Sequence, residues 1–172
     1  MKKTKGFTAA EIEKTFENIK KSHSPESAYL HANLMRAVNA SHLSYNTLDF
    51  ICGTNTGIRK IWGHSGMMGV VMCNRVARSL SVLFDEHYTI DDLISRDIDF
   101  PDMSTDPDWG VSLTDEQLRE AAALFGADFD KMVEQGKHSY TQRLVKAYKT
   151  LNEQQERDCM GDYTREELEA VA

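Results

Sequence analysis

Repeated helix-start signatures constrain the fold of this chain more than any other feature of its sequence. In Phe7-Thr8-Ala9-Ala10-Glu11-Ile12, Thr8 can accept a backbone N–H bond, Glu11 can reach back to Thr8, and an apolar residue stands on each side. A capping box with a hydrophobic staple of this kind marks the start of a helix. The box recurs at Thr114, Ser139 and Thr164. At Ser24-Pro25, proline occupies the first position of an expected helix. Five such starts predict an all-α fold.

Apolar residues between these starts recur at helical spacing. Ile12, Phe16 and Ile19 form one stripe, and a second runs from Leu144 to Leu151. Glycines stand at or just after several expected helix ends, where a left-handed residue is favoured, at positions 53, 63, 126, 136 and 161. We expect helices over residues 8–22, 25–39, 43–52, 56–62, 66–85, 90–96, 114–125, 128–135, 139–157 and 164–171. No alternating pattern of useful length predicts a strand.

The most apolar stretch runs from Gly66 to Phe84. Asn74, Arg75 and Arg78 stand near its middle, where the centre of a membrane would tolerate them poorly. The stretch is therefore interpreted as a buried helix, with Val76 and Leu80 in the core. A chain of 172 residues is long enough for one hydrophobic core. We expect a single domain over 1–172, a compact multi-helix bundle around a central apolar helix at about 66–85.

The termini and cysteines indicate a cytoplasmic protein. Residues 1–6 are basic, but a capped polar helix follows them where a signal peptide requires an apolar run. Three cysteines, at 52, 73 and 159, are odd in number and form no CxxC pair, which favours reduced thiols. The sequence predicts no membrane association and no cofactor, and it leaves the oligomeric state open.

The net charge of −7 conceals a division along the chain. Residues 1–27 carry six basic and four acidic side chains, and residues 28–84 carry five and one. Residues 85–135 carry three basic and fifteen acidic side chains, and residues 136–172 carry six and seven. This division has two interpretations: a basic face that meets an anion such as a phosphate backbone, or two segments that pair with each other.

The basic part of the chain contains two short expected helices around a glycine turn, from Leu43 to Trp62. Their internal contacts would be Leu48, Ile51, Ile58 and Ile61. This segment resembles the helix-turn-helix of DNA-binding regulators, although Asp49 stands where that motif has a small residue and the spacing after Gly53 is one residue short. The resemblance covers residues 43–62 alone and implies that the outward residues contact DNA, namely Thr54, Asn55, Thr56, Arg59 and Lys60.

The longest irregular stretch, residues 97–112, is an acidic loop. Apolar and acidic residues alternate in it, which is typical of an apolar anchor inside a negative rim that recognises a basic protein. The residues of that surface are Phe100, Asp102, Met103, Asp106, Asp108 and Trp109. The alternative is a solvated loop whose Trp109 folds back onto the core.

Residue spacing gives no indication of a metal site or of catalysis. A calcium-binding loop starting at Ser104 would have Trp109 at its glycine position and would lack the bidentate glutamate. The six histidines follow no metal-ligand or nucleophile pattern, and Gly63-His64-Ser65-Gly66 lacks the spacing of a nucleophile turn. We therefore expect no metal, no catalytic residues and no enzymatic activity.

These observations predict a small regulatory protein that acts by binding. The leading hypothesis is a DNA-associated transcription regulator that uses residues 43–62. The alternative is a protein-binding inhibitor or adaptor of the phage or mobile-element type, which would use the acidic segment 97–109.

Overall fold

The computed structural model describes residues 6–43, 45, 48, 52, 69–107, 114–125 and 149–150. In these residues the chain forms α1 (Ala9–Ser22), α2 (Pro25–Ser41), α5 (Val70–Phe84), α6 (Ile90–Ser95), the 3₁₀ turn η1 (Met103–Thr105) and α7 (Asp115–Phe125). The part of the chain so described contains no strand. The predicted all-α fold is confirmed, and each of these α-helices overlaps an expected one. The turn η1 was not expected, because it lies within residues 97–112, which were interpreted as an irregular loop.

The predicted caps account for three helix starts. The Thr8 hydroxyl accepts a bond from the Glu11 backbone N–H at 3.1 Å, and the Glu11 carboxylate accepts one from the Thr8 N–H at 2.7 Å. Thr114 and Gln117 form the same reciprocal pair at the start of α7. Ser24 caps α2, with proline at its first position. The expected caps at 139 and 164 lie outside the described residues.

Other helix boundaries use residues that the sequence analysis did not single out. Thr89 and Asp92 form a capping box at the start of α6, with aspartate in the place of the usual glutamate. His42 and Asp85 end α2 and α5 in the left-handed conformation, with φ of 57° and 54°. The glycines expected to end helices, at 53, 63, 126, 136 and 161, all lie outside the residues that the structure describes.

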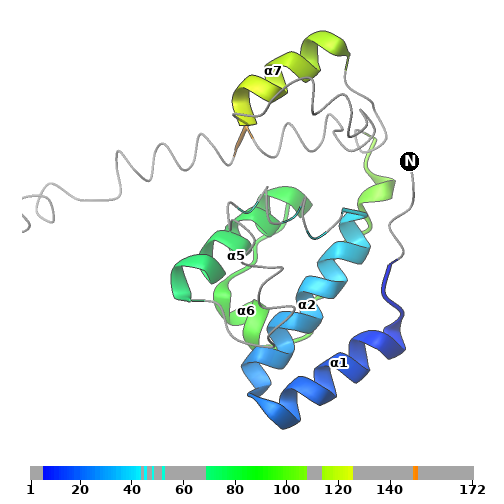
Figure 1. The fold of residues 1–172 in the computed structure, drawn as a ribbon, viewed down its shortest axis with the longest axis vertical. Coiled ribbons are helices and arrows are strands. Elements are labelled where there is room, and N and C mark those ends of the chain that lie inside the picture. The colour runs from blue at the N-terminus through cyan, green and yellow to red at the C-terminus, as the bar shows by residue number, and fades with distance from the viewer. Residues whose placement is uncertain are drawn as a thin grey trace, which may run out of the picture.

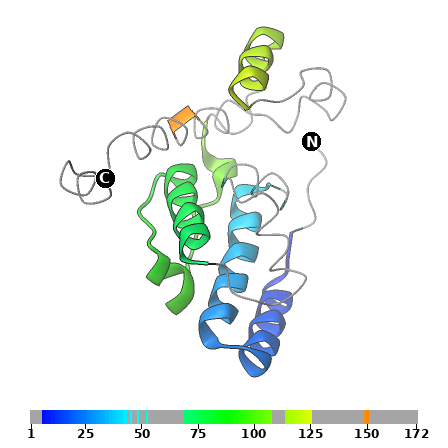
Figure 2. The ribbon, with the colours of Figure 1, turned by 60° about the vertical axis from the view of Figure 1, so that its left-hand side comes forward.

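Helix α2 occupies the middle of the described fold. In both ribbon views α1 lies on one side of α2, with α5 and α6 on the other (Figures 1 and 2). Contacts join α2 to α1, α6 and η1, and join α5 to α6. Helix α5 contributes to the core but leaves Asn74 and Arg75 exposed. Within the described residues, α2 also belongs to the core, since its buried residues extend around most of its circumference.

The main core joins α2, α5, α6 and the segment after α6. Val76 and Leu80 are both 0% exposed, which confirms the predicted core positions. Phe100 packs between two aromatic rings, 4.8 Å from that of Phe84 and 5.1 Å from that of Tyr88 between centroids. A smaller cluster lies under α1 and contains Ile12, Ala32 and Met35.

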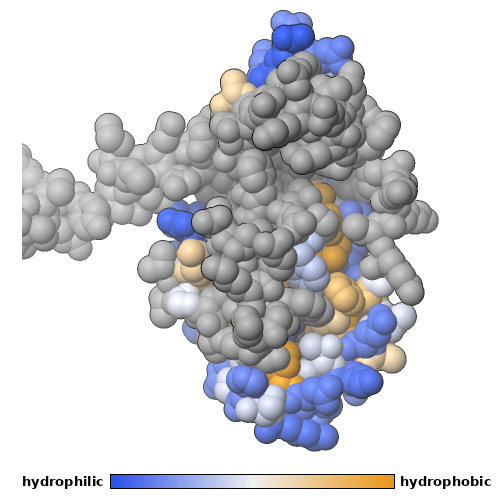
Figure 3. Space-filling model, in the orientation of Figure 1, coloured by the Kyte–Doolittle hydropathy of each residue, from blue (hydrophilic) through white to orange (hydrophobic). Residues whose placement is uncertain are grey.

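Helix α7 lies apart from the group formed by α1, α2, α5 and α6 in both ribbon views (Figures 1 and 2). Hydrophilic residues dominate the lower edge of the molecule, where α1 meets α2 (Figure 3). Within the described ranges, no helix is both long enough and apolar enough to cross a membrane.

Tyr45, Leu48 and Cys52 are helical, as are Lys149 and Thr150, in agreement with two expected helices. Those at 56–62, 128–135 and 164–171 fall on undescribed residues.

Candidate functional site

The segment after α6, residues 97–106, runs back along α2 and is called the strap below. Three of its apolar side chains are buried: Ile98 is 2% exposed, and Phe100 and Met103 are 7% exposed. Asp97, Asp99 and Asp102 are exposed. The strap is therefore anchored by its apolar side chains, and it presents its carboxylates to solvent.

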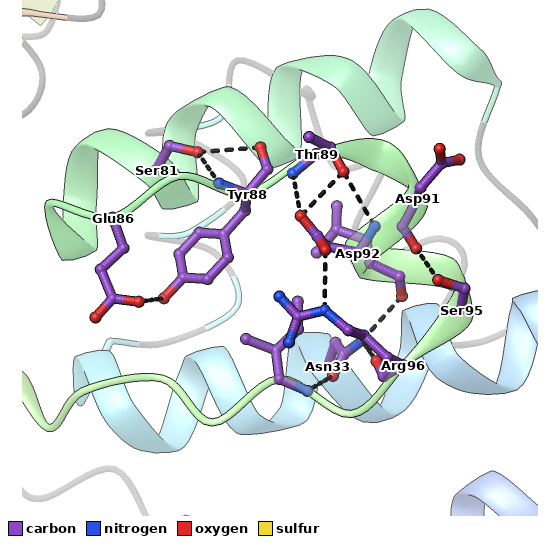
Figure 4. Close-up of polar contacts among 11 residues, drawn as sticks. Asn33, Ser81, Glu86, Tyr88, Thr89, Asp91, Asp92, Ser95 and Arg96 are labelled. Atoms are coloured by element: carbon purple, nitrogen blue, oxygen red, sulfur yellow. Dashed lines mark hydrogen bonds and ion pairs between the residues drawn. The ribbon is translucent and has the colours of Figure 1, made fainter.

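One buried amide of α2 holds the strap and the end of α6. The Asn33 side chain, 0% exposed, donates from Nδ2 to the carbonyl oxygens of Leu93 and Arg96, each at 2.9 Å. Its Oδ1 accepts from the backbone N–H of Ile98 at 3.0 Å and from Arg36 Nη1 at 3.1 Å. Figure 4 shows Asn33 of α2 beside Arg96, which follows α6. An asparagine side chain has two donor hydrogens and two acceptor lone pairs, and all four are used here.

Two polar pairs join the strap to α2 nearer the surface. Arg36 Nη1 contacts Asp97 Oδ1 at 3.0 Å, and His42 Nε2 contacts Asp102 Oδ1 at 2.7 Å. The Asp102 carboxylate also accepts the Ser104 backbone N–H at 2.9 Å, at the start of η1. The bond with His42, followed by the bonds with Ser104, lowers the pKa of Asp102 to about 2. Asp102 is therefore a fixed anion in the fold.

Two further sets of bonds order the connection from α5 to α6 and the α6 helix itself (Figure 4). The Ser81 hydroxyl accepts the Tyr88 backbone N–H at 2.9 Å, and the Tyr88 hydroxyl donates to Glu86 at 2.9 Å. Burial and the contact with Glu86 raise the pKa of Tyr88. The Asp92 carboxylate accepts from the Thr89 backbone and from Arg96, and these bonds lower its pKa to about 2.

Carboxylates are concentrated around α6 and the strap. Residues 85–107 contain eight acidic side chains and one basic side chain, Arg96. Six of the acidic residues are exposed and form what is called the acidic surface: Asp85, Glu86, Asp91, Asp97, Asp99 and Asp102. Asp97 and Asp102 pair with α2 and its C-cap residue, so part of the charge division is compensated internally. The side chains of the other three aspartates form no hydrogen bond or ion pair with the described part of the chain.

An open groove of about 290 Å³ lies between the C-terminal half of α2 and the strap. Apolar side chains contribute to its lining together with one guanidinium, one amide and two carboxylates. The lining residues are Arg36, Asn39, Ala40, Ile98, Asp99, Phe100 and Asp102. The groove thus combines apolar surface with carboxylates of the acidic surface.

The sequence-predicted site residues are only partly brought together here. Phe100 and Met103 were expected as exposed anchors for a partner, and this was wrong because both are core residues. Asp102 is exposed and Asp106 is half-buried. The remaining predicted residues lie outside the described ranges, namely Asp108, Trp109, Thr54, Asn55, Thr56, Arg59 and Lys60. Asn33 and His42, which hold the strap, were not predicted from the sequence. Each is a single polar residue within or just after a helix and belongs to no recognisable motif.

Among the described residues, no group of three or more His, Cys, Asp or Glu side chains could hold a metal ion. The arrangement contains charged surface, a groove and ordered backbone, which are features of binding sites. Comparisons with protein-family models, with curated proteins and with solved structures found no match to this chain.

Proposed function

We propose that this protein acts by binding, and that its acidic surface docks a basic surface of a partner protein. The observation that carries this proposal is the ordered strap, whose apolar side chains are buried while Asp97, Asp99 and Asp102 are exposed. A strap pinned by Asn33 presents these carboxylates in fixed positions, so little conformational entropy is lost on binding. This role corresponds to the inhibitor or adaptor hypothesis.

Recognition by this surface is mainly electrostatic, because Ile98, Phe100 and Met103 of the strap are at most 7% exposed and leave only a small apolar area at the groove. Complementary charge speeds association and excludes partners of like charge. We therefore expect binding to weaken as salt is raised, since exposed charges are screened over roughly 8 Å at physiological ionic strength.

The test uses the three aspartates of the acidic surface that have no bonded side-chain partner among the described residues. The variant Asp85→Asn, Asp91→Asn, Asp99→Asn should fold normally and lose a stoichiometric protein that the parent captures from a nuclease-treated bacterial lysate. The matched control changes three exposed glutamates of α1 and the start of α2 by the same total charge: Glu13→Gln, Glu17→Gln and Glu26→Gln. Equal capture by the two triple variants would reject the acidic surface as the docking site.

A DNA-associated regulatory role is the second candidate. It is favoured by the absence of acidic residues between Phe50 and Phe84, where Arg75 is exposed on α5. Its proposed contact residues include Arg59 and Lys60, outside the described part of the chain. Replacing both by alanine should reduce the magnitude of the salt slope of DNA binding by about 2, because each phosphate contact releases condensed counterions. Absence of measurable binding to any duplex at about 50 mM salt would reject this role.

A further inference from the structure

Arg36 and Asn39, the cationic and the amide side chain of the groove lining, already bond to other residues of the fold. Arg36 Nη1 is paired with Asp97 and bonded to Asn33. The Asn39 amide donates to the Phe7 carbonyl at 2.8 Å and accepts the Phe7 N–H at 2.7 Å. Both groups are therefore held by neighbouring residues, and neither determines which ligand the groove would accept.

Acceptor capacity remains at the two carboxylates of the groove. The Asp99 side chain is exposed and makes no hydrogen bond or ion pair with any residue that the structure describes. Asp102 accepts from His42 and from the Ser104 backbone at Oδ1, and the Ser104 side chain also bonds to it, so Asp99 holds most of the remaining capacity. Next to these acceptors lie the apolar lining residues Ala40, Ile98 and Phe100.

We infer that the groove receives one arginine or lysine side chain of the partner, with its charged end at Asp99 and Asp102 and its aliphatic stem along the apolar lining. Arginine and lysine carry only donors, which complement a site whose remaining capacity is for acceptance. Their stems commonly cover apolar surface while the charged end stays at the solvent edge. A volume of about 290 Å³ is at the lower limit of small-molecule pockets and suits a single side chain. This inference rests on the proposed function and specifies the partner's contact residue.

The experiment titrates ¹⁵N-labelled full-length protein with N-acetyl-arginine-N-methylamide at about 100 mM salt, where long-range attraction is screened. The probe should shift the backbone amide signals of Ala40, Asp99 and Phe100 in a saturable way. The citrulline counterpart has nearly the same shape but no charge, and it should produce no saturable shift. Equal shifts with the two probes, or shifts that do not saturate, would overturn the inference.

Two variants with the same change of charge separate the groove from the rest of the acidic surface. Asp99→Asn should weaken binding of the arginine probe about fivefold, the effect of losing a contact of about 1 kcal/mol. Asp91→Asn lies on α6, outside the groove lining, and should change the affinity less than about twofold. Equal effects would mean diffuse attraction, which rejects the groove but leaves the proposed function standing. The proposed function would be rejected instead if both triple variants still captured the partner while the arginine probe still bound the parent in a saturable way.

Discussion

Helix α5 and the strap both pack into the main core, but different forces hold them there. Helix α5 contributes a continuous apolar face, with Cys73, Val76, Ala77, Leu80 and Leu83 all buried. The strap has no repeating backbone bonds beyond the single turn of η1, so its position depends on alternate apolar anchors and on the side chain of Asn33. A helix satisfies its own backbone groups, whereas an extended segment in the core must find partners elsewhere.

Helix α2 contacts both kinds of segment. One face of α2 meets α1 through apolar residues, and another supplies polar side chains to segments without regular structure. Asn33 serves the strap, and Asn39 serves the backbone of Phe7 before α1. A helix that carries one buried and one half-buried amide thus positions irregular segments as well as other helices.

A single charge in the apolar face of α5 should disrupt its packing. Leu80→Asp places a carboxylate at a position that is 0% exposed, so it should cost more than about 4 kcal/mol and abolish cooperative unfolding. Thermal unfolding followed by circular dichroism measures this effect. The control Leu80→Met keeps the volume and should cost less than about 1.5 kcal/mol. An unfolding curve of Leu80→Asp that matches the parent would contradict the core position of α5.

Loss of the Asn33 amide should weaken the attachment of the strap to α2. Asn33→Leu removes the acceptor for the Ile98 N–H and the donor for two carbonyl oxygens, and we expect destabilisation by about 3 kcal/mol. Denaturant titration gives the free energy of unfolding, and hydrogen exchange at the Ile98 amide reports on the strap directly. Asn18→Leu makes the same change at an exposed position of α1 and should stay within about 0.5 kcal/mol of the parent. Similar losses in the two variants would show that the Asn33 bonds add little.

The two regions also differ in how far the sequence predicted them. Spacing of apolar residues placed Val76 and Leu80 in the core, because core positions recur with the helical period. Capping patterns placed the starts of α1, α2 and α7, because a cap and its partner are separated by a fixed, short distance in the sequence. The bonds of Asn33 to Leu93, Arg96 and Ile98 join residues 60 to 65 positions apart, and no local sequence pattern around a single asparagine within a helix predicts such partners. Burial of Phe100 was missed for a related reason, since a proline-containing acidic stretch resembles a solvated loop.

A second amide of α2 makes a tighter test of the same principle. An ideal Cβ at Gly6 would lie 2.8 Å from Asn39 Oδ1, and that amide is held by two bonds to Phe7. Gly6→Ala should therefore displace the amide and cost about 1 to 2 kcal/mol of unfolding free energy. In an Asn39→Ala background the added methyl group meets no amide, so the cost of Gly6→Ala should fall below about 0.5 kcal/mol. Additive losses would mean that the two residues do not interact.

The smallest effect is expected at the outer edge of the strap, where solvent screens the pair formed by His42 and Asp102. The pKa of Asp102 is about 2 in the folded protein, below its ordinary value of 3.8, because bonds from His42 and Ser104 stabilise the charged form. A lowered folded-state pKa contributes stability that is fully present above pH 3.8 and is lost as the pH falls toward 2. Asp102→Asn should therefore unfold at a slightly lower temperature than the parent at pH 7, and the difference should shrink as the pH is lowered through this window.

Asp99→Asn changes the charge equally without removing a bond, so its thermal midpoint should follow the parent's across the same range. A gap between Asp102→Asn and the parent that stays constant from pH 7 to about pH 2.5 would mean that the carboxylate's charge contributes nothing to holding the strap, and that its attachment rests on Asn33, the Arg36–Asp97 pair and the buried apolar side chains.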